Sequence, residues 1–134
     1  GIIARIKEAG KIAVVHVDLI AGISSQDAAV DYLEQYAKAD GIISTRTSLV
    51  KRAKEKGLIS ILRMFIIDSM AYDNLPDMIE VLPGMMPKVI ERICHDSKIP
   101  VIAGGLISDR DDVMTLLQTG VLGVSTTAQD LWFI

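Results

Sequence analysis

The sequence has a single cysteine and few aromatic residues, and these shortages exclude several kinds of site. Cys94 stands alone among 134 residues, so it has no intrachain disulfide partner, which is typical of a reducing compartment. Aromatic residues make up 4% of the chain, so a platform for stacking nucleic-acid bases is not evident. CxxC and HExxH motifs are absent. We therefore predict no metal site, no cofactor and no identifiable set of catalytic residues.

Long apolar runs and a strong net charge are also missing. No run approaches the roughly 20 apolar residues that cross a bilayer, and the first residues do not resemble a secretory signal. We therefore expect a cytoplasmic protein with no membrane association. Fourteen basic residues against 17 acidic ones give a net charge of −3. Any surface that binds nucleic acid must therefore be local.

Half of the residues are hydrophobic, and short apolar segments alternate with amphipathic ones. The expected strands are residues 11–18, 41–45, 58–65, 77–82, 99–103 and 121–125. The expected helices are residues 2–9, 24–38, 48–56, 87–96 and 108–119. Ser24 or Ser25 is the expected cap of the second helix, and Ser108 with Asp111 resembles a capping box. Apolar strands that alternate with helices predict a parallel sheet in an α/β protein.

The number of segments predicts a (β/α)8 TIM-like barrel that is incomplete in this sequence. Residues 1–134 then form a single barrel domain with six visible strand–helix units of an expected eight. A closed barrel takes about 200–250 residues, so the first strands are expected to be missing. Residues 69–76 also lack the apolar stripe of a crossover helix. One crossover helix is therefore expected to be absent through disorder or deletion.

Ionisable residues fall on the expected strands. Strand alternation places His16 and Asp18 on one face of the first strand, Arg63 on an inner face of the third, and Glu80 on that of the fourth. Ligands of such barrels bind at the C-terminal ends of the strands. A structural role is an equal alternative, in which Arg63 neutralises Glu80 without contacting a ligand.

The last two expected strands carry a stronger signal for phosphate. Gly104 and Gly105 end one strand, and Ser125 and Thr126 end the next. Glycines let backbone N–H groups approach phosphate oxygens, and hydroxyl groups complete the cradle. Residues 127–132 are expected to form the short extra helix that accompanies many barrel phosphate sites. A Gly-Gly pair alone also marks ordinary tight turns.

Residues 46–56 hold five bases and one acid. Arg46, Lys51, Arg52 and Lys54 are therefore candidates for contacts with RNA phosphates. The simpler alternative is a solvated helix face.

Five sequence segments together resemble one family, the glycerol uptake operon antiterminator regulatory proteins. These segments are HVDLI at 16–20, GIISTR at 41–46, EVLPG at 80–84, IPVIAGGLI at 99–107 and LGVSTT at 122–127. The resemblance implies an eight-unit barrel that responds to glycerol 3-phosphate and acts on leader mRNA to prevent premature transcription termination. Its pattern has a strand, a helix and another strand before Gly1, and a full helix at 69–76.

The resemblance and the residue pattern agree on a ligand with a phosphate group. Gly105, Ser125 and Thr126 are expected to hold the phosphate, Asp18 and Glu80 to accept hydroxyl hydrogen bonds, and Arg63 to balance charge. A barrel isomerase or lyase acting on a small phosphorylated metabolite is the alternative, since His16, Asp18 and Glu80 suit acid–base chemistry. A scaffold that assembles into a homo-oligomer is a third possibility.

Overall fold

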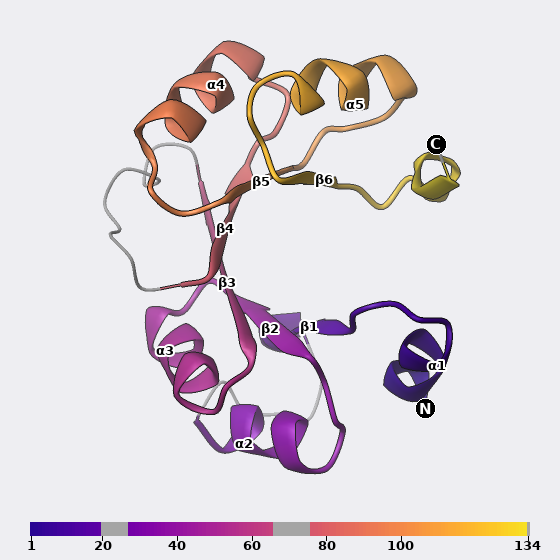
Figure 1. The fold of residues 1–134 in the computed structure, drawn as a ribbon, viewed down its shortest axis with the longest axis vertical. Helices are drawn as coiled ribbons and strands as arrows, with labels where there is room; N and C mark the ends of the chain where they lie inside the picture. The colour runs from indigo at the N-terminus through magenta and orange to yellow at the C-terminus, as the bar shows by residue number, and fades with distance from the viewer. Residues whose placement is uncertain (20–26, 66–75, 134) are drawn as a thin grey trace. The chain divides into compact units, whose positions relative to one another are not determined.

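The computed structural model describes residues 1–19, 27–65 and 76–133 (Figure 1). The expected caps Ser24 and Ser25, and all but the last residue of the expected short segment 69–76, lie outside this range. The described chain forms two compact units. One unit is Gly1–Leu62 with Leu75–Asp77, and the other is Arg63–Asn74 with Met78–Ile134.

The first unit contains three helices and the first strands. Its elements are α1 (Ile2–Glu8), β1 (Val14–His16), the 3-10 helix η1 (Val17–Leu19), α2 (Asp27–Gln35), β2 (Gly41–Ser44), α3 (Thr47–Glu55) and most of β3 (Ile59–Phe65). Strand β2 is buried along its whole length because helices α2 and α3 belong to the same core. Ile42, Leu49 and Val50 have at most 1% of their surface exposed.

The second unit repeats the pattern of strand followed by helix. Its elements are the end of β3, β4 (Met78–Leu82), α4 (Pro87–Asp96), β5 (Val101–Gly104), α5 (Arg110–Leu117), β6 (Gly123–Ser125) and the 3-10 helix η3 (Gln129–Phe133). Val81 of β4, Ala103 of β5, Ile90 of α4 and Leu116 of α5 are fully buried and form the centre of its core. Pro87 begins α4, where its missing N–H costs no helical hydrogen bond.

The strands form one sheet in the order β1-β2-β3-β4-β5-β6. Pairing is parallel between β1 and β2, β2 and β3, β4 and β5, and β5 and β6. The predicted α/β class with a parallel sheet is therefore confirmed. The described residues contain six strands, so a closed barrel of eight strands is not shown by this part of the chain.

Two local predictions are wrong. The expected strand 11–18 is shortened to Val14–His16, because the chain turns into η1 at Val17, and Asp18 therefore does not lie on a strand. Helix α5 is capped by Asp109, whose carboxylate accepts a hydrogen bond from the N–H of Asp112, instead of by Ser108 with Asp111. Ser108 instead donates to the carboxylate of Asp112.

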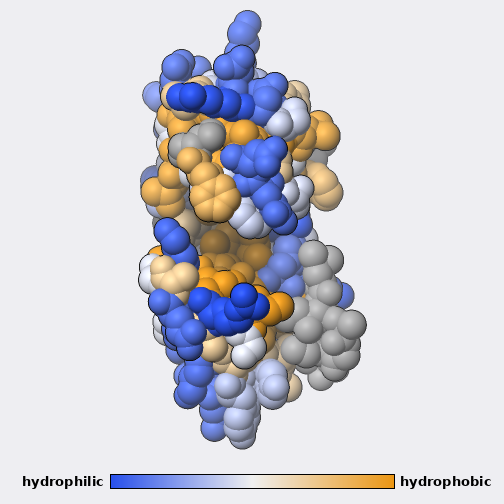
Figure 2. All heavy atoms as spheres, turned by 90° about the vertical axis from the view of Figure 1, so that its right-hand side faces the viewer, coloured by the Kyte–Doolittle hydropathy of each residue, from blue (hydrophilic) through white to orange (hydrophobic). Residues whose placement is uncertain are grey.

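The end of the second helix is also predicted wrongly. The expected helix 24–38 stops earlier, because α2 ends at Gln35, and Tyr36 beyond it is 69% exposed. Its ring lies 5.5 Å from that of Tyr32, which is also exposed. On the face drawn in Figure 2, hydrophobic residues, in orange, are interspersed with hydrophilic residues, in blue. Within the described ranges, no helix combines the length and the apolar character required to cross a membrane.

Candidate functional site

The candidate site lies in the second unit, where β4, β5 and β6 reach their C-terminal ends. Gly84 follows β4, Gly104 and Gly105 end β5, and Ser125 ends β6. The parallel register sets Gly104 opposite Ser125. The N–H of Gly84 donates a hydrogen bond to the carbonyl of Gly105 over 3.2 Å. The strand register therefore brings together three of the residues predicted to bind phosphate.

The glycines at this end of the sheet are required by close backbone packing. A Cβ atom on Gly84 would lie 3.0 Å from the carbonyl oxygen of Gly104. A Cβ atom on Gly104 would collide with Oγ of Ser125 and lie 3.4 Å from the carboxyl carbon of Glu80. The Ser125 hydroxyl therefore lies directly against Gly104, near the Glu80 carboxylate.

Glu80 is a buried acid held beside a base. It is 8% exposed, and its Oε1 lies 3.0 Å from Nε of Arg63. The ion pair of the structural alternative is therefore present, whereas a contact of either residue with a ligand stays a prediction. Burial of a carboxylate is costly unless a cation or hydrogen-bond donors compensate its charge. Arg63 supplies that compensation. The pair fixes a carboxylate beside Gly84, Gly104 and Gly105, which we call the glycine cluster.

The loop after β5 has an unusual backbone. Gly105 has φ +89° and Leu106 has φ +62°, a conformation that a bulky residue such as leucine rarely adopts. Leu106 is 77% exposed, so packing of its side chain does not explain the strain. Within the described residues, the N–H groups of Leu106 and Ile107 donate no hydrogen bond. Strained loops with available N–H groups are common at ligand sites.

Thr126 connects this loop to the segment after β6. Its hydroxyl donates to the carbonyl of Ile107 over 3.1 Å and accepts from the N–H of Ala128 over 3.0 Å. The indole N–H of Trp132 donates to the Thr126 carbonyl. The hydroxyl has one proton, so in this arrangement Thr126 positions the two loops and does not donate to a ligand. The short extra helix predicted at 127–132 is present as the 3-10 helix η3.

His16 and Asp18 belong to the first unit, and the described geometry does not join them to the glycine cluster. Asp18 accepts hydrogen bonds from the Ser44 hydroxyl at 2.7 Å, the Thr45 N–H at 2.8 Å and the Thr45 hydroxyl at 2.9 Å. Partial burial alone would raise the pKa of Asp18, but these donors outweigh burial and lower it. Asp18 therefore connects the end of β1 to the end of β2.

The basic helix α3 is largely neutralised by acidic neighbours. Arg52 makes two hydrogen bonds of 2.9 Å to the carboxylate of Asp31, and Lys54 lies 3.8 Å from Asp77. The pairing lowers the pKa of Asp31 and raises that of Arg52. Arg46 and Lys51 are exposed and form no ion pair with another described residue. Two of the four predicted RNA contacts are thus occupied, and two are available.

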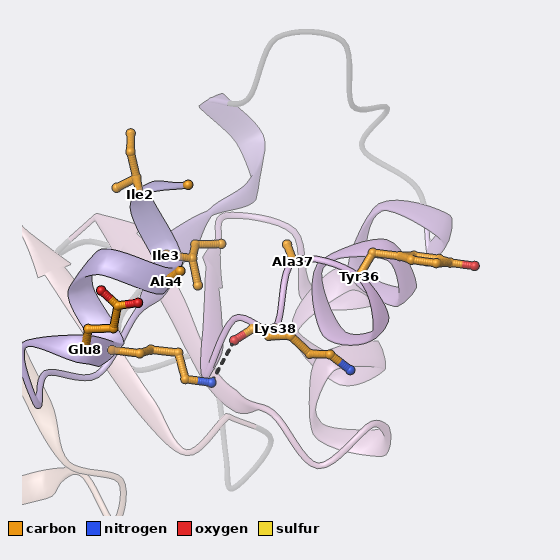
Figure 3. Close-up of a pocket in the computed structure, with 9 residues that line it drawn as sticks. Ile2, Ile3, Ala4, Glu8, Tyr36, Ala37 and Lys38 are labelled. Atoms are coloured by element: carbon orange, nitrogen blue, oxygen red, sulfur yellow. Dashed lines mark hydrogen bonds between the residues drawn. The ribbon is translucent and has the colours of Figure 1, made fainter.

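Sequence reasoning missed a pocket of about 670 Å³ between α1 and the end of α2 (Figure 3). Figure 3 shows Ile3 and Ala4 facing Ala37, while the ring of Tyr36 points away from α1. The Lys7 ammonium group donates to the carbonyl of Lys38 over 3.1 Å. The pocket is lined mainly by apolar groups.

In the part of the chain that is described, no group of three or more His, Cys, Asp or Glu residues is arranged to hold a metal ion.

The fold and this site define an α/β protein of repeated strand–helix units with polar groups gathered at the C-terminal ends of its parallel strands. Residues 1–132 match the family model described as glycerol-3-phosphate responsive antiterminator. The chain belongs to this family, as the sequence resemblance predicted.

Individual relatives agree with the family match. The chain is 41% identical to the uncharacterized protein YgcP of Escherichia coli K12, over 98% of the chain and 73% of that protein. It is 36% identical to a glycerol uptake operon antiterminator regulatory protein of Listeria monocytogenes, with a TM-score of 0.86 over 98% of the chain and 75% of that structure. A glycerol uptake operon antiterminator-related protein of Thermotoga maritima is 28% identical, with a TM-score of 0.78 over 98% and 79% of the two chains.

A more distant likeness concerns the fold alone. The chain superposes on an aldolase named QR15 with a TM-score of 0.64 and 12% identity, over 92% of the chain and 73% of that structure. At this identity, the likeness supports the α/β architecture and does not transfer an activity.

Proposed function

We propose that this protein is a transcription regulator that binds glycerol 3-phosphate and then acts on the leader mRNA of glycerol genes to prevent premature termination. Membership of the antiterminator family supports the regulatory role. The observation that carries the proposal for this chain is the cluster of Gly84, Gly104, Gly105 and Ser125 beside the Glu80–Arg63 pair. The cluster provides close backbone approach and a hydroxyl group at one end of the sheet.

The phosphate in this proposal lies at the loop that follows Gly105. The N–H groups of Leu106 and Ile107 are available there, as far as the described residues extend. Oriented backbone N–H groups stabilise phosphate oxygens without a lysine or arginine. Arg63 offsets the charge of Glu80, so a dianion near this loop does not meet an uncompensated carboxylate.

We also propose that the complete fold is a (β/α)8 barrel. The sequential order of the six strands supports this architecture, since such a barrel is built by adding each strand–helix unit beside the previous one. The likeness to an aldolase supports the same architecture. The chain spans about three quarters of the length of its E. coli and Listeria relatives.

The site favours a sensor over an enzyme of the aldolase kind. Lysine forms a Schiff base with carbonyl substrates in many enzymes. None of the six described strands contains a lysine. The ionisable groups at the glycine cluster are Glu80 and Arg63, and these neutralise each other.

Thermal unfolding tests the effector. The chain is melted with glycerol 3-phosphate, with glycerol and with inorganic phosphate. A ligand at 100 times its Kd stabilises the folded state by about 2.7 kcal/mol. We expect a clear rise in Tm with glycerol 3-phosphate and a smaller or absent rise with the other two compounds. The absence of a rise with all three would refute the effector site.

Gly105→Asp is a poor variant for this test, although the sequence suggests it. A side chain at φ +89° is strained, and its Cβ would lie 3.0 Å from Leu82, so loss of binding could reflect misfolding. Gly105 is therefore better left unchanged, and ligand contacts are better tested at side chains.

Leader-RNA binding is tested at the two available bases of the basic segment. The double variant Arg46→Glu with Lys51→Glu is expected to weaken RNA binding and to reduce the slope of log K against log salt by about 1.4 to 1.8, since each phosphate contact contributes roughly 0.7 to 0.9. Arg52 and Lys54 are left unchanged because both pair with acids.

The matched control reverses two exposed bases elsewhere. Lys88 and Arg92 are exposed on α4 and form no ion pair with another described residue. Lys88→Glu with Arg92→Glu changes the net charge by the same amount. Equal losses of RNA affinity in both double variants would indicate a general effect of charge. Unchanged RNA affinity in both would show that Arg46 and Lys51 do not contact RNA.

A further inference from the structure

We infer that Glu80 and Ser125 form a hydroxyl-binding subsite that recognises the glycerol part of the effector, while its phosphate lies farther out along the Gly105 loop. The inference rests on the proposed function and deepens it. Ser125, which the sequence predicted to hold the phosphate, is assigned instead to recognition of the hydroxyl groups of the ligand. It predicts that the protein binds phosphorylated polyols and discriminates against alkyl phosphates.

The geometry places two polar groups over one glycine. Oγ of Ser125 lies close enough to clash with a Cβ on Gly104, and the carboxyl carbon of Glu80 is 3.4 Å from the position of that Cβ. Ser125 ends β6 and Glu80 lies in the middle of β4, on either side of β5. Gly104 places no side chain between these two groups.

Both groups retain hydrogen-bonding capacity. The Ser125 hydroxyl makes no hydrogen bond with another described residue. Oε1 of Glu80 is paired with Arg63, and no hydrogen bond joins the other carboxylate oxygen to a described residue. Glu80 is nine-tenths buried, so water is a limited substitute for a ligand at this position. A buried carboxylate with an available oxygen is stabilised by hydroxyl donors.

Hydrogen-bond polarity decides which part of the effector this subsite accepts. The Glu80 carboxylate and a phosphate dianion both only accept hydrogen bonds, whereas a hydroxyl group of the ligand donates one to the carboxylate. The Ser125 hydroxyl can accept from one hydroxyl of the ligand and donate to another. The Glu80–Ser125 pair therefore fits a neutral polyol segment and disfavours an anion.

Binding of glycerol 3-phosphate is compared with binding of propyl phosphate by titration calorimetry. Propyl phosphate keeps the three carbons and the phosphate but lacks both hydroxyl groups. The unmodified chain is expected to bind glycerol 3-phosphate at least tenfold more tightly, since hydrogen bonds to a charged group typically change affinity by about 10- to 100-fold. Ser125→Ala and Glu80→Gln are expected to weaken glycerol 3-phosphate about tenfold and to leave propyl phosphate within about twofold.

Thr115→Ala provides the matched control. Thr115 is exposed on α5 of the same unit, and its hydroxyl makes no hydrogen bond with another described residue, so this variant should bind both compounds as the unmodified chain does. The melting temperature of each variant shows that it is folded. If Glu80→Gln unfolds through loss of its pair with Arg63, Ser125→Ala alone decides the outcome.

Different results separate this inference from the proposed function. Equal affinity of the unmodified chain for the two compounds would overturn the subsite and leave the phosphate site intact. Equal weakening of both compounds in Ser125→Ala would also overturn it, because Ser125 would then contact the phosphate. If the unmodified chain binds neither compound, the proposed effector site itself fails, and the subsite fails with it.

Discussion

The hydrogen bonds of Asp18 predict a measurable loss of stability in Asp18→Ala. Its carboxylate accepts from the hydroxyl of Ser44 and from the N–H and hydroxyl of Thr45. Ser44 is fully buried, so its donated hydrogen bond has no replacement from water in the variant, at a cost of about 1–3 kcal/mol. Thr45 is exposed, and water replaces most of its two bonds, which leaves about 1 kcal/mol. The expected loss is about 2–4 kcal/mol.

Urea unfolding at pH 7 measures this loss, and its dependence on pH checks the cause. The pKa of Asp18 is lower in the folded chain than its ordinary value of 3.8. The stabilisation is therefore fully present above pH 3.8 and is lost as pH falls through the lowered folded pKa. We expect the difference between the unmodified chain and Asp18→Ala to be constant near neutral pH and to shrink in acid.

Asp130→Ala is the control for this measurement. Asp130 is exposed in η3 and makes no hydrogen bond with another described residue, so its removal should change stability by less than about 0.5 kcal/mol. A loss of 0.5 kcal/mol or less in Asp18→Ala, or a difference that persists unchanged below the folded pKa, would refute the assignment of Asp18 as a structural connector.

Three further changes test other parts of the fold. Gly41→Ala places a Cβ 2.6 Å from the carbonyl oxygen of Ile59, so we expect a loss of about 1–3 kcal/mol in urea unfolding, and a neutral result would contradict the close approach of β2 and β3. Leu116→Ala empties a fully buried position of the second unit and is expected to cost about 2–5 kcal/mol, whereas exposed Leu117→Ala should cost much less. Asp109→Ala removes the cap of α5 and should cost about 1 kcal/mol, and the unchanged stability of Ser108→Ala would separate the cap from its neighbour.

Most of the secondary structure was predictable because it depends on local patterns. Pro87 begins a helix where predicted, and Gly57 and Gly120 follow helix ends with positive φ. The start of β1 was not predictable, since Ile12 is apolar in sequence but 66% exposed. The end of α2 was missed for a related reason, because a helical pattern does not show where the helix stops.

The site was predicted in part. The proximity of the glycines and Ser125 was predictable because parallel strands all end at one edge of a sheet. The Glu80–Arg63 pair was predictable as an alternative because strand alternation places both residues on inner faces. The sequence did not show that Thr126 uses its hydroxyl to join two loops, or that Arg52 is held by Asp31. Both contacts link residues far apart in the chain, and their partners depend on how the elements pack.

The sequence by itself determined the alternation of strand and helix, the family, and which residue types stand at the strand ends. Hydrophobic periodicity, helix-stop glycines and short family segments are local features, and a single chain carries them. The tertiary structure decided which of those residues remain available to a ligand or to RNA. Oγ of Ser125 lies over Gly104 because register sets the two opposite each other, whereas acidic neighbours neutralise most of α3. Whether a side chain is available to a ligand or to RNA depends on which partners folding brings close to it. The spacing of residues in the sequence does not encode those partners.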